Sequence, residues 1–205
     1  MFITLEGPEG SGKTSQVAPL AEFLTRLGHD VLTLREPGGS DIGEQIRSVI
    51  MAMKNTAMHP RTEILLFLAS RAQFVEEIVQ PALRAGKWVL CDRYADSTLA
   101  YQGYGHQVDL DILRQLLKFA TGGLTPDLTL LLDVETQTGL TRKRKAGGEW
   151  NRLDAYPSDF HQRVRQGYLE LARQEPQRWV VIDAGQPVEM VQSAMCQAVL
   201  ARVQA

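Results

Sequence analysis

The chain has 205 residues, a formal net charge of −2 at pH 7 and a hydrophobic fraction of 44%. This length allows a buried core and predicts one domain over residues 1–205, while the balanced charge argues against a general nucleic-acid or membrane-surface binder. No apolar run approaches the roughly 18 residues that a membrane span needs, so we expect a cytoplasmic protein that binds neither nucleic acid nor membrane.

Five short apolar runs alternate with segments long enough for helices. The runs cover residues 2–5, 31–34, 88–91, 128–132 and 179–182. Alternation of this kind predicts a parallel sheet with crossover helices, and the continuous apolar character of the strands predicts that helices cover both faces. We therefore expect a three-layer α/β fold with five parallel strands, in which ligands bind at the carboxyl ends of the strands.

The first run leads directly into a phosphate-binding motif. The residues fit the pattern G-x-x-x-x-G-K-[ST], and apolar residues at helical spacing follow them, so the motif has the strand and helix that it requires. Backbone N–H groups of such a loop surround phosphate oxygens, while Lys13 would neutralise the β- and γ-phosphates and Thr14 would bind Mg²⁺. The alternative is a structural glycine turn. The motif consists of Gly7, Pro8, Glu9, Gly10, Ser11, Gly12, Lys13 and Thr14.

Charged residues follow the second, third and fourth runs. The second run is followed by Arg35-Glu36-Pro37-Gly38-Gly39, which is either an ordinary surface turn with an ion pair or a turn beside the phosphate loop. The third run ends in Asp92-Arg93, where an aspartate would hold Mg²⁺ or assist the attacking oxygen and an arginine would bind a second phosphate. Asp133 after the fourth run is a rival for the role of Asp92, with a helix cap or loop residue as its alternative.

The helical segment 62–73 places an aromatic ring and a cation on one face. Phe67 and Arg71 are four residues apart, so together they would stack a flat base and donate to a carbonyl on its edge. The alternative is core packing for Phe67 and a surface ion pair for Arg71. The other apolar residues of the segment cover so much of its circumference that part of it would face another subunit.

Residues 141–152 carry five basic residues and one acid, interrupted by Gly147 and Gly148. A charge run is commonly a solvated helix face, but glycines within it favour a mobile lid over about 142–152 that closes on transferring phosphates. The residues predicted to act from this lid are Arg142, Arg144 and Arg152. Closure would exclude water as a competing phosphoryl acceptor.

In order and spacing these segments resemble bacterial thymidylate kinases across nearly the whole chain. The matching segments are FITLEGPEGSGKT, REPGG, GEQIR, LLFLASRAQ, DRYADSTLAYQG and the basic segment followed by RLD. The resemblance implies a P-loop nucleoside-monophosphate-kinase fold, transfer of phosphate from ATP to dTMP with Mg²⁺ in dTTP synthesis, and a homodimer. The phosphate loop lacks an arginine between Gly7 and Lys13, which resembles the subgroup that supplies its catalytic arginine from the lid.

The resemblance also implies roles for individual residues at the phosphates. Lys13 and Thr14 would serve ATP and the metal ion, with Asp92 as a further metal-binding and catalytic residue and Arg142 on the ATP side. The dTMP phosphate would be held by Arg93, with help from Arg35, Glu36, Pro37 and Arg47. The loop 183–187 lies where the family holds adenine.

The same comparison assigns the nucleoside of dTMP. Phe67 would stack on the base, Arg71 would donate to O4 of thymine, and Thr98 and Gln102 would read the rest of the thymine edge. Glu9 would meet the 3′-hydroxyl, and the ring of Tyr101 would lie against C2′.

Two other functions fit part of the sequence. Another nucleoside-monophosphate or deoxynucleoside kinase of the same fold would differ in the residues that read the base. A P-loop switch protein or nucleotide-dependent binding module would use conformational change as its output, but it has no use for Arg93 or for the basic segment.

Overall fold

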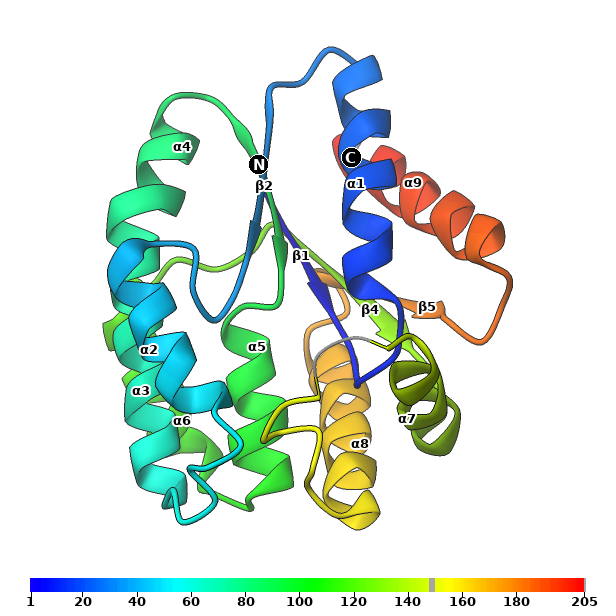
Figure 1. The fold of residues 1–205 in the computed structure, drawn as a ribbon. Helices are drawn as coiled ribbons and strands as arrows, with labels where there is room; N and C mark the ends of the chain where they lie inside the picture. Colours follow the sequence, from blue (N-terminus) through cyan, green and yellow to red (C-terminus); the bar gives the residue numbers. More distant parts are fainter. Residues whose placement is uncertain (148–149, 205) are drawn as a thin grey trace.

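A five-stranded parallel sheet forms the centre of the computed structural model, which describes residues 1–147 and 150–204 (Figure 1). The strand order is β2-β3-β1-β4-β5, and each neighbouring pair is parallel. The strands are β1 (Phe2–Glu6), β2 (Val31–Arg35), β3 (Trp88–Asp92), β4 (Leu128–Asp133) and β5 (Trp179–Asp183). Each predicted apolar run is confirmed as a strand, and each strand extends one residue further, to a charged residue at its carboxyl end.

Helices cover both faces of this sheet, which confirms the three-layer α/β fold. On one face α1 (Lys13–Arg26) and α9 (Val188–Gln204) pack together against the strands. On the other face lie α3 (Pro60–Phe74), α4 (Gln80–Arg84), α5 (Ala95–Thr98), α6 (Leu110–Thr121) and α8 (Ser158–Gln174). Two further helices lie near the carboxyl edge, α2 (Asp41–Met51) against α3 and α7 (Thr136–Lys145) after β4.

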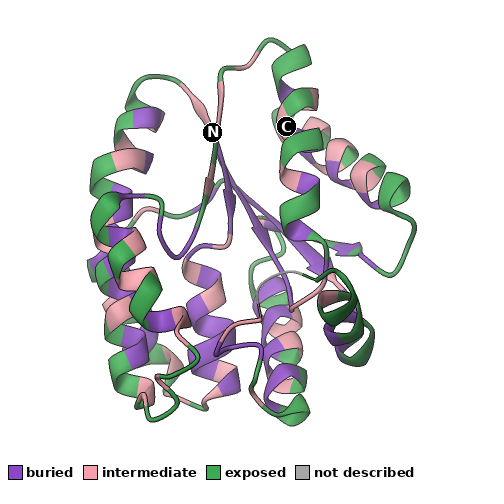
Figure 2. Ribbon diagram, in the orientation of Figure 1, coloured by how far each residue is buried: buried purple, intermediate pink, exposed green. Residues whose placement is uncertain are grey.

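Successive strand residues enter different cores because strand side chains alternate between the two faces of the sheet. Leu130 and Leu132 of β4 pack in the cluster that contains Leu20 of α1 and Met195 of α9. Leu131, between them, packs in the cluster that contains Tyr168 of α8. The three inner strands β1, β3 and β4 are accordingly almost entirely buried, whereas the edge strands β2 and β5 are partly exposed and the outer surfaces of the helices are exposed (Figure 2).

Two π-helical segments continue neighbouring α-helices, and the sequence did not predict them. η1 (Val75–Val79) follows α3, and η2 (Leu99–Gly105) follows α5. A π-helical turn holds more residues than an α-helical one and is frequent at functional sites. Both Tyr101 and Gln102 lie in η2 and are buried, so this segment decides how two of the predicted substrate-binding residues are presented.

The phosphate loop and α7 touch through two glycines. Gly10 has a positive φ of 69°, and a Cβ atom at that position would overlap the carbonyl group of Gly139 in α7. In return, a Cβ atom on Gly139 would overlap the carbonyl oxygen of Glu9. The close approach of the two backbones therefore requires glycine on both sides of the contact.

We predict that Gly139→Ala lowers the free energy of unfolding by about 1–3 kcal/mol, the usual cost of forcing extra volume into a packed contact. Urea unfolding followed by circular dichroism measures this change. Helix propensity acts in the opposite direction, because alanine favours a helix over glycine by about 1 kcal/mol. A gain in stability would therefore show that the two backbones are not in contact. Thr138→Ala, at an exposed neighbouring position, is the control and should change stability by less than about 0.5 kcal/mol.

Candidate active site

A cavity of about 1540 Å³ opens at the carboxyl edge of the sheet. Its walls come from the phosphate loop, the turn after β2, one side of α3, the end of α5 and the start of η2, the basic end of α7, and the loop 184–188. Ligands of open parallel sheets bind at this edge. Segments that are distant in the sequence therefore meet where the fold predicts a ligand.

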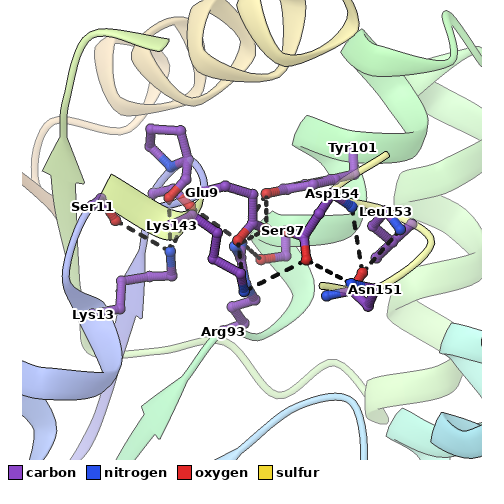
Figure 3. A network of polar contacts seen from close by, with 12 residues as sticks. Glu9, Ser11, Lys13, Arg93, Ser97, Tyr101, Lys143, Asn151, Leu153 and Asp154 are labelled. Atoms are coloured by element: carbon purple, nitrogen blue, oxygen red, sulfur yellow. Dashed lines mark hydrogen bonds and ion pairs between the residues drawn. The ribbon is translucent and has the colours of Figure 1, made fainter. Parts of the chain in front are cut away.

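Lys13 lies folded over the phosphate loop (Figure 3). Its ammonium group donates to the carbonyl oxygens of Gly7 and Pro8 at 3.0 and 2.9 Å and to the hydroxyl of Ser11 at 3.2 Å. Burial and the nearby charge of Arg93 lower the pKa of Lys13 to about 8, against the opposing effect of Glu9 and other acids. The loop therefore holds a cation that is poorly neutralised by the protein alone.

Thr14 and Asp92 lie next to each other below the loop. The hydroxyl of Thr14 donates to Oδ2 of Asp92 at 2.7 Å. The donor set fits Mg²⁺, which binds through one or two protein oxygens and otherwise keeps water and phosphate ligands. Among the described residues no group of three or more His, Cys, Asp or Glu side chains could hold a metal ion.

The rival aspartate is occupied elsewhere. Arg165 of α8 donates to both carboxylate oxygens of Asp133, at 2.7 and 2.8 Å. Such a bidentate pair satisfies the carboxylate and fixes its direction. The structure therefore favours Asp92 over Asp133 as the acid beside the phosphate loop.

Arg93, Glu9 and Tyr101 form a closed triangle of polar contacts (Figure 3). Arg93 donates to Oε1 of Glu9 at 2.7 Å and to the hydroxyl of Tyr101 at 3.1 Å, and that hydroxyl donates to Glu9 at 2.7 Å. Burial opposes the charge on Glu9, but Arg93, Lys13 and Lys143 together lower its pKa to about 2. Glu9 is therefore ionised at neutral pH.

Arg93 reaches this position from a strained backbone. Its φ is 70°, in the left-handed region that costs a non-glycine residue free energy. The following backbone N–H, that of Tyr94, donates to the buried carboxylate of Glu6 at 2.7 Å, and Ser97 donates to the same carboxylate at 2.6 Å. The charged end of β1 thus holds the turn that presents Arg93.

Arg93 and Lys13 also share an acceptor. Nη1 of Arg93 donates to the carbonyl oxygen of Gly7 at 3.2 Å, the same atom that receives the ammonium group of Lys13. The two cations therefore lie on either side of one carbonyl group, close enough for their charges to interact.

At the other end of the cavity Arg71 is buried and contacts three other residues. Its guanidinium group pairs with Glu36 at 2.6 Å and donates to Thr98 at 2.9 Å and to the carbonyl oxygen of Tyr94 at 3.0 Å. The alternative interpretation of Arg71 as a surface ion pair is therefore wrong, because its side chain is 2% exposed. Phe67, one turn earlier on α3, both lines the cavity and packs against Ile50 and Leu153.

The sequence comparisons agree on one family. The family model described as Thymidylate kinase matches residues 5–195. The chain belongs to the thymidylate kinase family. Curated relatives named thymidylate kinase include one from Roseiflexus sp. (strain RS-1), 50% identical over 92% of this chain and 88% of its own, and one from Syntrophotalea carbinolica, 51% identical over 93% and 90%. The crystal structure of thymidylate kinase from Ehrlichia chaffeensis aligns with a TM-score of 0.80 at 32% identity, over 97% of this chain and 98% of that one.

Most residues that the family resemblance indicated line the cavity. They come from six separate segments of the sequence, which the fold brings together. Arg35 is exposed and pairs with Glu44 at 3.1 Å, while Arg47 donates to the carbonyl oxygen of Pro37 at 2.9 Å. The predicted residues that line the cavity are Glu9, Gly10, Ser11, Gly12, Lys13, Thr14, Arg35, Glu36, Pro37, Arg47, Phe67, Arg71, Asp92, Arg93, Thr98, Tyr101, Gln102 and Arg142.

The three arginines of the basic segment do not converge on the phosphate loop. Arg142 donates to the carbonyl oxygens of Ala184 and Gly185. Arg144 lies over the ring of Trp150 at 5.3 Å, and Arg152 is buried, with its guanidinium group paired with Glu63. Neither Arg144 nor Arg152 is among the described residues that line the cavity. Their catalytic roles stay predictions, as does lid mobility, since Gly148 and Glu149 lie outside the described residues.

Lys143 is the basic residue that sequence reasoning missed. Its ammonium group lies 3.8 Å from Oε2 of Glu9 and 3.6 Å from Oδ2 of Asp154 (Figure 3). Lys143 follows Gly139 by four residues, which places both on one face of α7. Gly139 is the sequence feature that could have pointed to Lys143, because a glycine in a helix permits the close approach of another backbone.

We predict that Arg71→Ala destabilises the free protein by about 3–5 kcal/mol, because it leaves the carboxylate of Glu36 buried without a partner. Burial already raises the pKa of Glu36, so proton uptake should reduce the deficit as pH falls from 7 to 5. Urea unfolding at both pH values measures the effect. The control is Arg61→Ala, at an exposed position of the same helix. Equal, small losses in both variants would show that the buried ion pair does not stabilise the fold.

Proposed function

We propose that the chain transfers the γ-phosphoryl group of ATP to dTMP and releases ADP and dTDP, as a cytoplasmic step of dTTP synthesis. The observation that carries the proposal is the shared carbonyl group of Gly7, with Lys13 on one side and Arg93 on the other. One cation suits the phosphates of a donor nucleotide and the other suits the phosphate of an acceptor. Membership of the thymidylate kinase family supports both the reaction and the nucleotides.

On the donor side, the phosphate loop binds ATP through its backbone and Lys13. Thr14 and Asp92 would hold Mg²⁺, which when bound would neutralise charge on the β- and γ-phosphates. Arg142 donates to the carbonyl oxygen of Ala184 in the loop that follows β5, and both residues line the cavity. We propose this loop as the adenine site. The side chains there contribute a shape for the base rather than a set of specific hydrogen bonds.

On the acceptor side, Arg93 binds the phosphate of dTMP, with Arg35 and Arg47 lining the same cavity. Glu9 and Tyr101 accompany Arg93 and would face the sugar. Phe67 offers its ring to the base, and Arg71 offers a guanidinium edge to O4. Thr98 and Gln102 complete the wall of the cavity at this end.

We propose that Lys143 is the cation of the basic segment that stabilises the transferring phosphoryl group. Arg144 and Arg152 are the further candidates from the same segment. Lys143 is the nearest of the three to the phosphate loop, because it reaches Glu9. Charge that develops on the transferring group is best stabilised by cations already oriented towards it. The lid-arginine subgroup therefore describes this chain only if Arg144 or Arg152 moves towards the loop when nucleotides bind.

The other candidate functions are less well supported. A switch protein has no use for a second phosphate-binding arginine beside the loop. Another nucleoside-monophosphate kinase would need a different set of donors and acceptors around the base than Arg71, Thr98 and Gln102.

In the part of the chain that the structure describes, none of the helices combines the length and the apolar character that a membrane span requires.

A homodimer is proposed on the surface character of two helices that pack together, α3 and α6. Leu65 of α3 is exposed, as are Ile112 and Phe119 of α6. A second copy of the chain would cover such side chains. Light scattering after size-exclusion chromatography measures the molecular mass and decides the point.

The direct test of the proposed function is release of ADP from ATP–Mg²⁺ with and without dTMP, with dTDP identified by chromatography. Strong dependence on dTMP and a matching amount of dTDP are expected. Slow hydrolysis of ATP that dTMP does not affect would support a switch protein instead. Greater activity with another monophosphate would support a different kinase of the same fold.

We predict that Lys143→Ala lowers kcat by at least about tenfold with little change in the affinity for either nucleotide, because this cation acts on charge that appears in the transition state. Lys145→Ala, two residues away and exposed, is the matched control and should keep its turnover. Arg144→Ala and Arg152→Ala complete the series. An unchanged kcat in Lys143→Ala together with a large loss in Arg144→Ala or Arg152→Ala would transfer the role to that arginine.

We also predict that ATP affinity falls as the pH rises above 8. The pKa of Lys13 in the free protein is about 8, below its ordinary value, so the free ammonium form is lost progressively from pH 8 upward while phosphate binding requires it. The dissociation constant should increase by up to about tenfold per pH unit. Calorimetric titration between pH 7.5 and 9.5 measures it. A dissociation constant that stays constant over this range would show that Lys13 remains charged.

A further inference from the structure

A buried carboxylate outside the cavity connects three parts of the chain. Glu63 of α3 is fully buried. Its Oε1 lies 2.8 Å from Nε2 of Gln102 and 3.2 Å from Nε2 of His106, and its Oε2 lies 2.5 Å from Nη2 of Arg152 and 3.1 Å from the hydroxyl of Tyr156. The four partners come from η2, from the residue that follows it and from the segment after α7. Glu63 is not among the described residues that line the cavity.

Glu63 acts as an acceptor at neutral pH. Burial favours its neutral form, but hydrogen bonds from His106 and Gln102 and the charge of Arg152 outweigh burial and lower the pKa to about 2. An ionised carboxylate has only acceptors. Every group that contacts it must therefore present a hydrogen.

This requirement fixes the orientation of one amide. Gln102 can meet Glu63 only with its NH₂ group, because its carbonyl oxygen would face another acceptor. The oxygen of the amide accepts no hydrogen bond from any residue in the described ranges, and Gln102 lines the cavity. The carbonyl oxygen is thus the side-chain acceptor of Gln102 that remains for a ligand.

We propose that Glu63 is a positioning residue for base selection, which holds the Gln102 amide so that an acceptor faces the base. The proposal rests on the function proposed above, in which Gln102 reads the base edge. Thymine and uracil carry N3–H, a donor, and satisfy this acceptor. Cytosine carries an unprotonated N3, so two acceptors would face each other and a buried polar group would lack a partner.

Arg71 favours the same bases, thymine and uracil, without the help of Glu63. Its guanidinium group has donors only, so it suits the O4 carbonyl of thymine or uracil and not the amino group of cytosine. Its orientation comes from Glu36, Thr98 and Tyr94, and none of these contacts Glu63 in the described part of the chain. The contribution of Glu63 is therefore separable from that of Arg71.

The test compares kcat/KM for dTMP, dUMP and dCMP in the wild type, in Glu63→Gln and in Tyr156→Phe. The amide introduced by Glu63→Gln has the same shape as the carboxylate but both accepts and donates, so both orientations of the Gln102 amide become possible. The ratio of dTMP to dCMP should fall by about tenfold, the equivalent of one hydrogen bond. The ratio of dTMP to dUMP should not change, since these bases share N3–H and differ only in the 5-methyl group.

Tyr156→Phe is the matched control, because it removes a different hydrogen bond to Glu63 and leaves Gln102 in place. Both ratios should remain at their wild-type values. A Glu63→Gln variant that loses the same factor with all three substrates would overturn the inference and make Glu63 a structural residue only. A wild type without dTMP-dependent ADP release would instead overturn the proposed function, and this inference with it.

A crystal structure of the wild type with dTMP is a second test that needs no variant to fold. The Gln102 amide should bridge Glu63 and N3 of thymine, with hydrogen-bond distances on both sides. An amide that contacts only one of them would overturn the inference.

Discussion

Two positive charges held on one carbonyl group are the constraint around which this site is built. Lys13 and Arg93 both donate to Gly7, and each raises the cost of keeping the other charged. Their repulsion is offset by Glu9, which pairs with Arg93, and by Asp92 and Glu6, whose charges favour protonated Lys13. Burial, together with the charge of Arg93, outweighs these acids and lowers the pKa of Lys13. A phosphate group bound beside these two cations would favour the charged form of both.

The sheet supplies this arrangement through its strand order. β1 lies between β3 and β4, so the phosphate loop after β1 is beside the turn after β3 that carries Arg93. Each strand ends in a charged residue at the same edge, where parallel strands place their carboxyl ends. Glu6 at the end of β1 accepts the backbone N–H of Tyr94, which shows that even the strained backbone of Arg93 depends on the neighbouring strand.

Local patterns in the sequence predicted the sheet and the phosphate loop, because strands and glycine loops are local features, and they singled out the ends of the strands. Many of the other residues of the cavity wall, such as Arg47, Tyr101 and Gln102, were indicated only by the resemblance to thymidylate kinases. Lys143 could not be identified in the same way. Lys143 and Arg144 carry the same charge in one run of basic residues, so the sequence alone does not show which of them approaches the phosphate loop. That depends on which face of α7 packs against the loop. Arg152 illustrates the converse, since its buried partner Glu63 is 89 residues away in the chain. The π-helical form of η2 has no residue signature either, although it sets the positions of Tyr101 and Gln102.

The contact between Gly10 and Gly139 fixes where α7 lies relative to the phosphate loop. The N-terminal half of this helix is held against the phosphate loop, whereas its last turn carries Arg142 and Lys143. At about 1.5 Å per residue, Lys143 lies about 6 Å along the helix axis from Gly139, which is about one turn. The glycine contact and the ion pair between Lys143 and Glu9 thus join the same helix to the same loop at two points, about one helical turn apart. The helix that packs on the phosphate loop through Gly139 is therefore also the helix that fixes how far the Lys143 ammonium group lies from that loop.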